Sequence, residues 1–307
     1  MAEESATLKA LEKEAERRRK EATDKANVPL PSPIKEIVST SVTYTVDPRI
    51  LPFSLVDGKR LTEVLNDKFR LTFKLPEVNA EAMRMLGLES QNLTEESLLR
   101  VVLKAANPQL LFENGRYPTG PSSFVPIEYI AFTRENIIVR VSGVTEVAEV
   151  VAADSFGALW ESTGALQNWD SPDVQGKVQM ISFSTTTKVD VGTGVRSFLN
   201  PALCSYLDSN VNEGAKLASK MNTYSRYDGF KPSDSMMGSW SFEEMYINVH
   251  SFDSTTGLAE TSKLHIDTQT KDERGRGMIN LSSSLPFDDH VKMVEEIVNG
   301  LKEQSKK

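Results

Sequence analysis

The chain has 307 residues, of which 39% are hydrophobic and 25% are charged. This usage is close to that of ordinary globular proteins and far from that of disordered chains. The formal net charge of −8 argues against nucleic acid as a main partner, because phosphate binding depends on clustered Lys and Arg. The length favours one large domain or two smaller ones.

The first 33 residues predict a charged helical arm and a proline-rich hinge. Residues 3–26 are rich in Ala, Glu, Lys and Arg, which are good helix formers, but their apolar stripe is thin. Such a helix either docks on a neighbouring chain or stays solvated, and the composition favours a solvated arm. Pro29, Pro31 and Pro33 stiffen the joint that follows, so the fold proper is expected to begin at residue 34.

Residues 34–163 alternate between strand and helix patterns. Alternating and β-branched runs predict strands, apolar periodicity predicts helices, and a stretch rich in Gly and Pro predicts a loop. In chain order the expected elements are strand 36–46, helix 58–66, strand 69–75, helix 93–106, loop 115–126, strands 127–132 and 137–141 joined as a hairpin, and helix 145–160. A linker is expected at 164–176.

Residues 177–307 repeat this succession and end in an amphipathic helix. The expected elements are strand 178–189, helix 200–219, polar loop 222–238, strands 239–252, 258–268 and 277–283, and a last helix opened near Pro286. The apolar stripe of the last helix is Phe287, Val291, Val294, Val298 and Leu301. The predicted class is therefore α+β, with antiparallel sheets and helices packed on one face.

A shift of 143 residues aligns two pairs of these elements. It sets Ile37–Asp47 on Met180–Asp190, with identical residues at Ser39, Ser41, Thr43, Val46 and Asp47. It also sets the stripe of the last helix on that of the helix at 145–160. Either the match is coincidence or 34–163 and 177–307 are two pseudo-symmetric halves. If the two halves are pseudo-symmetric, their element order resembles that of the TATA-binding-like saddle and of the helix-grip folds. A likeness of element order alone implies no function.

The polar chemistry of the sequence is sparse. The three histidines are His250, His265 and His290, and no nucleophile elbow, P-loop or His-Glu-x-x-His pattern occurs. Two aspartates before His290 suit the positive end of a helix dipole. The weak metal candidates are His265, Asp267, Asp288 and His290, and each set needs further ligands. We therefore predict no catalytic residue, no bound metal and no cofactor.

One cysteine and the absence of long apolar runs indicate the compartment. Cys204 excludes an intrachain disulfide and a cysteine-built zinc or iron–sulfur site. Residues 1–20 lack the apolar core of a signal peptide, and no run of 18 apolar residues occurs. The sequence predicts a cytoplasmic protein with no membrane partner.

A loop rich in aromatic side chains and methionine is the candidate binding surface. Large contact side chains of this kind are enriched at protein interfaces, but a loop folded over the core has the same composition. The candidate interface residues are Tyr224, Tyr227, Phe230, Met236, Met237 and Trp240.

Three functions remain open on these grounds. The favoured hypothesis is a non-enzymatic protein-binding or assembly subunit that acts as a homo-oligomer or with a protein partner. The second is a small-ligand binder or enzyme with a pocket between the sheet and the C-terminal helix. The third is a structural subunit of a virion or other particle.

Overall fold

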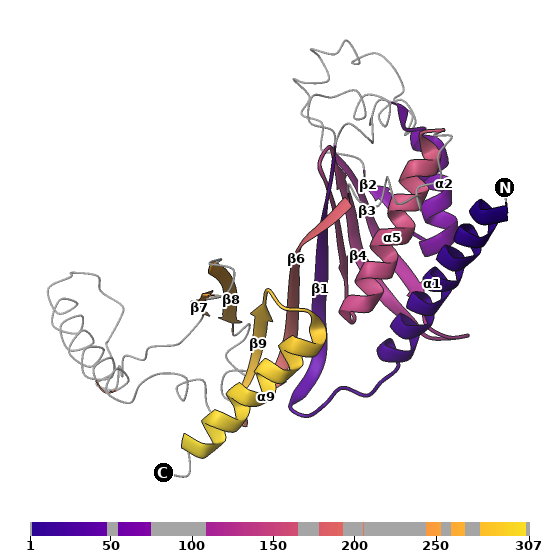
Figure 1. Ribbon diagram of the computed structural model, residues 1–307. Coiled ribbons are helices and arrows are strands. Elements are labelled where there is room, and N and C mark those ends of the chain that lie inside the picture. Colours follow the sequence, from indigo (N-terminus) through magenta and orange to yellow (C-terminus); the bar gives the residue numbers. More distant parts are fainter. Residues whose placement is uncertain are drawn as a thin grey trace, which may run out of the picture. The chain divides into compact units, whose positions relative to one another are not determined.

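A computed structural model describes residues 2–47, 55–74, 109–164, 178–192, 205, 244–252, 259–267 and 277–304. Its elements are α1 (Ala2–Ala26), β1 (Ile34–Val46), α2 (Gly58–Phe69), β2 (Thr72–Lys74), β3 (Gln109–Pro118), β4 (Phe124–Thr133), β5 (Asn136–Val141), α5 (Thr145–Ser162), β6 (Val178–Asp190), β7 (Glu244–Phe252), β8 (Ala259–Asp267), β9 (Met278–Ser283) and α9 (Phe287–Gln304) (Figure 1). The predicted linker, the helices predicted at 93–106 and 200–219, and the aromatic loop lie outside the described residues.

Antiparallel strands and packed helices confirm the predicted α+β class. The chain divides into two compact units, each made of several segments. The first unit comprises Met1–Pro31, Glu36–Thr187 and Ser283–His290, and the second comprises Ser32–Lys35, Lys188–Ser282 and Val291–Lys307. The prediction of separate halves at 34–163 and 177–307 stays a prediction.

The first unit is a sheet with strand order β2-β3-β4-β5-β1-β6. The pairs β2–β3, β3–β4, β4–β5 and β1–β5 are antiparallel. The hairpin predicted from the residues between 127 and 141 is confirmed, with β4 running into β5. Figure 1 shows α2, α5 and α1 on one side of this sheet. Helix α5 contacts both α1 and α2, and it also packs on β5.

Helix α2 owes its place to a regular apolar face. Leu61, Leu65 and Phe69 recur every four residues and are at most 2% exposed. Each such side chain contributes about 1.5–3 kcal/mol on burial. The Asp57 carboxylate caps the helix by accepting hydrogen bonds from two backbone amides of its first turn, and Arg70 ends it in the left-handed region.

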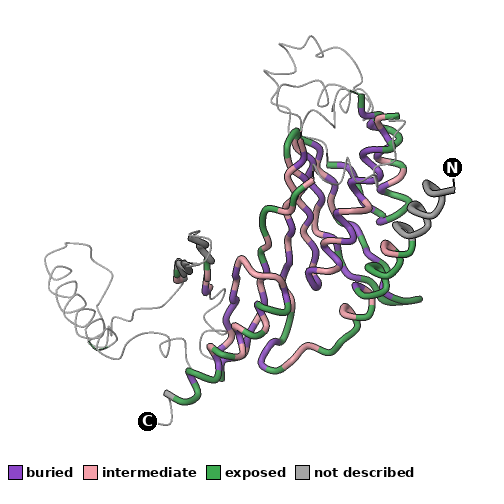
Figure 2. The backbone as a smooth tube through the Cα atoms, viewed as in Figure 1, coloured by how far each residue is buried: buried purple, intermediate pink, exposed green. Residues whose placement is uncertain are grey.

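Helix α5 is buried on nearly every side. Its buried residues include Val147, Val151, Phe156 and Leu159, which point in different directions around the axis. A helix that is apolar all round belongs inside a core, and the sheet, α1 and α2 surround this one. Figure 2 shows the contrast with α1, where exposed residues predominate.

Two local predictions in the first unit are wrong in part. The strand predicted at 69–75 begins later, because Phe69 belongs to the apolar face of α2, and β2 spans Thr72–Lys74. The loop predicted at 115–126 is confirmed only at 119–123, because its two ends belong to β3 and β4. Gly115 is needed within β3, since a Cβ there would lie 2.6 Å from a Leu71 methyl carbon.

The second unit contains β7, β8 and β9 and most of α9. Strands β7 and β8 form an antiparallel pair over nine register positions, from Glu244 opposite Asp267 to Phe252 opposite Ala259. On α9 the predicted stripe is confirmed at Val294, Val298 and Leu301, which are at most 7% exposed.

The elements related by the 143-residue shift have matching lengths. Strands β1 and β6 each have 13 residues, and helices α5 and α9 each have 18. Strands β5 and β9 each have six residues. The pseudo-symmetry of the halves stays a prediction.

Among the described residues, no helix combines the length and the apolar character needed to cross a lipid bilayer.

Candidate functional site

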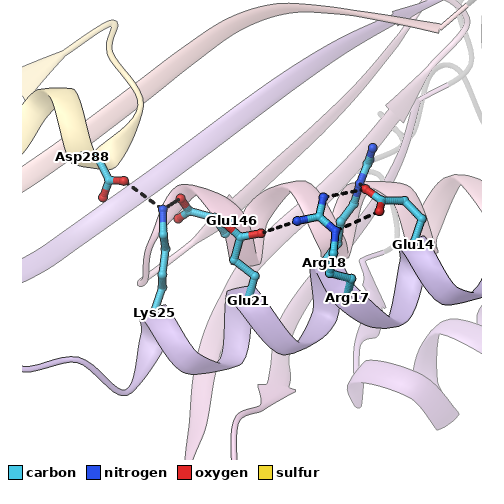
Figure 3. A network of polar contacts seen from close by, with 7 residues as sticks. All are labelled: Glu14, Arg17, Arg18, Glu21, Lys25, Glu146 and Asp288. Atoms are coloured by element: carbon cyan, nitrogen blue, oxygen red, sulfur yellow. Dashed lines mark hydrogen bonds and ion pairs between the residues drawn. The ribbon is translucent and has the colours of Figure 1, made fainter.

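Helix α1 is held to the first unit by ion pairs. The Arg19 guanidinium lies 2.7 Å from an Asp154 carboxylate oxygen on α5. The Lys25 ammonium donates hydrogen bonds to Glu146 on α5 and, at 2.8 Å, to Asp288 in the first turn of α9 (Figure 3). Arg19 and Lys25 of α1 therefore contact α5, although most residues between 13 and 26 are exposed to solvent.

The apolar contribution to this docking is small. Between residues 13 and 26, the buried hydrophobic side chain is that of Ala22. Burial on its own lowers the pKa of Lys25, but its hydrogen bonds to Asp288 and Glu146 together raise that pKa above the ordinary value. The ammonium therefore stays charged, and the link between α1, α5 and α9 depends on charge.

A second set of charged side chains pairs within α1 itself. The Glu14 carboxylate accepts hydrogen bonds from Arg17 and Arg18, which lowers the pKa of Glu14 to about 2. The Arg17 guanidinium also reaches Glu21, one turn further along (Figure 3). These pairs, three and four residues apart, stabilise the helix itself.

A groove of about 680 Å³ lies between α1 and α5. Strands β1, β5 and β6 supply its floor, and every lining residue belongs to the first unit. The larger apolar side chains of the lining are those of Ile137, Val150, Phe156, Val178 and Met180. The walls carry charged side chains of α1 and α5. An apolar base with polar groups above it is the usual composition of a small-molecule site.

Glu149 is the lining carboxylate whose charge is unmatched. The lining includes five acids, and Glu14, Glu21, Glu146 and Asp154 each pair with a base. Glu149 makes no hydrogen bond or ion pair with any other described residue. Burial raises the pKa of Glu149 and the negative charge of Glu146 raises it further, while the positive charges of Arg18 and Lys25 lower it in part.

The phenol of Tyr44 on β1 lies near this carboxylate. Burial raises the pKa of Tyr44 above its ordinary value, and the charge of Glu149 raises it further, while Arg18 lowers it. Within the part of the chain that the structure describes, the Tyr44 hydroxyl makes no hydrogen bond. A neutral phenol and a carboxyl group of raised pKa can bind a polar ligand group or exchange a proton with it.

His290 is fully buried at the first turn of α9. Its Nδ1 lies 2.7 Å from the Ser283 hydroxyl, and its Nε2 lies 2.7 Å from the Thr187 hydroxyl. Burial lowers the pKa of His290 to about 4. The ring is therefore neutral near pH 7, with one nitrogen donating and the other accepting a hydrogen bond.

The other metal candidates have contacts of their own. The His265 ring stacks on the Tyr246 ring, with centroids 4.1 Å apart. Asp267, two residues on, lies opposite Glu244 in the β7–β8 register. Asp288 pairs with Lys25. Among the described residues, no three His, Cys, Asp or Glu side chains gather as a metal site would require.

The candidate interface residues at 224–240 lie outside the described residues, so the interface stays a prediction. The groove was missed in the sequence, although one signal is visible there. Glu149 and Asp154 interrupt an otherwise apolar run on α5. A carboxylate in a helix of that character requires either a partner or an opening to solvent. Asp154 has partners in Arg19 and Lys68, and Glu149 faces the groove.

Comparison with known proteins adds no relative: no protein family model matches the chain, and neither a curated protein nor a solved structure matches it.

Proposed function

We propose that this protein binds a small molecule in the groove between α1 and α5. The observation that carries the proposal is the groove itself, whose lining joins an apolar floor to the unmatched carboxyl of Glu149 and the phenol of Tyr44. Its volume of about 680 Å³ falls within the range of about 300–1,000 Å³ that is usual for ligand sites.

The support for α1 as a wall of the site comes from its mode of docking. Ion pairs at Arg19 and Lys25 fix the helix at two points of α5, and apart from Ala15 the α1 side chains that line the groove are charged. Had α1 carried a continuous apolar face, its side chains would have filled that space as ordinary core. A ligand in the groove can therefore contact α5, β1 and β6 while α1 remains docked on α5.

This proposal differs from the pocket expected beneath the C-terminal helix, which stays a prediction. The assembly hypothesis also stays a prediction, since its candidate interface residues lie outside the described part of the chain. The groove favours the ligand-binding hypothesis because it is built from described residues of one unit.

The test is to fill the groove. Ala153 lines it on α5 and is half-exposed, so Ala153→Trp places an indole in the ligand space, whereas Ala153→Ser preserves that space. The probe is Nile red, an uncharged apolar dye whose fluorescence rises in apolar sites. We expect the wild type and Ala153→Ser to bind the dye alike, and Ala153→Trp to bind it at least about tenfold more weakly, a loss of about 1.4 kcal/mol.

Equal urea midpoints for the two variants would establish that the difference is one of binding and not of folding. Equal dye binding by Ala153→Trp and Ala153→Ser would overturn the proposed site.

A further inference from the structure

We propose that the ligand of this groove carries a positive charge on an apolar body, with Glu149 as its counter-ion. The inference rests on the proposed function and names the chemical class of molecule that the site takes. An alkylamine is the simplest member of that class.

The charge balance of the lining is the first argument. The bases Arg17, Arg18 and Arg19 each pair with an acid of the same lining, at distances of 2.7–3.1 Å for their closest contacts. Glu146 forms an ion pair with the Lys25 ammonium. After these pairings Glu149 is the one carboxylate of the lining without an ion-paired or hydrogen-bonded base among the described residues. A ligand cation completes the set, whereas a ligand anion must displace an existing partner of an arginine.

The position of Glu149 is the second argument. It lies on α5 one residue before Val150 and one turn after Glu146, so the carboxylate stands beside the apolar part of the lining. A half-buried carboxylate without a partner loses hydration and gains no compensating contact. An ammonium group donates up to three hydrogen bonds, which Glu149 and the Tyr44 oxygen accept together.

The floor determines the rest of the ligand. Ile137 on β5 and Val178 and Met180 on β6 present hydrocarbon and a thioether without a charge. An apolar chain or ring that covers such a surface displaces water from it. The free energy gained is roughly 25 cal/mol for each Å² of apolar surface buried. A compact, strongly hydrated cation such as a metal ion gains nothing from this floor, so the expected ligand is an organic amine.

The experiment compares three ligands with one tail and different heads. Decylamine, decanol and decanoic acid are titrated near pH 7 by competition with Nile red, below their micelle-forming concentrations. We expect decylamine to bind wild-type protein roughly tenfold to a hundredfold more tightly than decanol, which is the usual value of a hydrogen bond to a charged group. Decanoate is expected to bind most weakly.

The variants isolate the charge. Glu149→Gln keeps the shape of the side chain and removes its charge, so decylamine loses its advantage while decanol binding is unchanged. Glu149→Asp keeps the charge and retains the preference in part. Glu161→Gln makes the same chemical change on α5 at an exposed residue outside the groove lining, and leaves all three affinities unchanged.

The outcomes separate this inference from the proposed function. If none of the three displaces Nile red and Ala153→Trp still binds the dye, the groove is not a ligand site. If decanol and decylamine bind equally, or Glu149→Gln keeps the preference, the site binds ligands but the charge assignment is overturned. Tightest binding by decanoate overturns it as well.

Discussion

Helices α1 and α2 both dock on α5, and they do so in opposite ways. Helix α2 buries Leu61, Leu65 and Phe69, each at most 2% exposed, and its charged residues are exposed, with only Lys68 reaching α5 among the contacts described. Helix α1 buries Ala22 and is attached by the ion pairs of Arg19 and Lys25. Asp154 of α5 takes part on both sides, since it binds Arg19 of α1 and Lys68 of α2.

The difference explains why the groove lies on one side of α5. Interdigitating apolar side chains close the space between helices to the density of a protein interior. On α1 the charged side chains end in ion pairs, and part of the space beside α5 remains open as the groove. Docking by charge also contributes little free energy at a surface, so the α1 side is expected to be the weaker of the two.

The largest expected effect is on the α2 side. Leu65→Ala leaves a cavity beneath a side chain that is fully buried, and we expect it to lower the free energy of unfolding by about 2–5 kcal/mol. Glu63→Ala, on the exposed side of the same helix, is the control and should change it by less than about 0.5 kcal/mol. Urea denaturation measures both. Equal effects would refute the apolar docking of α2.

The buried, neutral ring of His290 is expected to make the stability of the protein depend on pH. Its pKa is about 4 in the folded protein and 6.5 as the ordinary value. Below pH 6.5 the unfolded chain takes up a proton that the folded ring refuses, so stability falls as the pH falls toward 4. The free energy of unfolding is expected to fall by on the order of 3 kcal/mol, because each unit of difference between the folded and unfolded pKa corresponds to about 1.36 kcal/mol.

The control for His290 is a side chain that does not titrate. In His290→Gln this part of the pH dependence is absent, although the variant is less stable than wild type at pH 7 because a packed ring is lost. Unfolding curves recorded between pH 7 and 4 give the comparison. A wild type and a Gln variant with the same slope would show that the ring is not buried as described.

The smallest expected effect is on the α1 side. Lys25→Met removes both ion pairs of a side chain that is 33% exposed. We expect the free energy of unfolding to fall by about 0.2–1 kcal/mol. Hydrogen exchange of the α1 amides should speed up in the variant while that of α2 stays the same. Lys20→Met, at an exposed residue of the same helix, is the matched control.

Salt gives the same test without a mutation. At about 1 M ionic strength the screening length falls to about 3 Å, so exchange in α1 should increase and exchange in α2 should not. An α1 that is insensitive to both Lys25→Met and salt would mean that its docking is not ionic.

Local patterns were enough to place most elements. The helix predicted at 58–66 is the first part of α2, and the stripe from Phe287 to Leu301 predicted α9. These signals are local because a helix brings residues three and four apart onto one face. Where a long-range contact decides, local signals failed, as at Gly115, which pairs with Ile127 of β4 and is a glycine because Leu71 approaches its Cα closely.

The amino-acid sequence by itself determined the α+β class, the periods of the helices and strands, and the charged character of α1, since each depends on neighbours along the chain. Tertiary structure decided that α1 docks by its charges, and that Tyr44, Ile137, Glu149 and Met180 share one groove. Those four residues come from β1, β5, α5 and β6. Their proximity is fixed by strand order and helix packing, which no local pattern encodes.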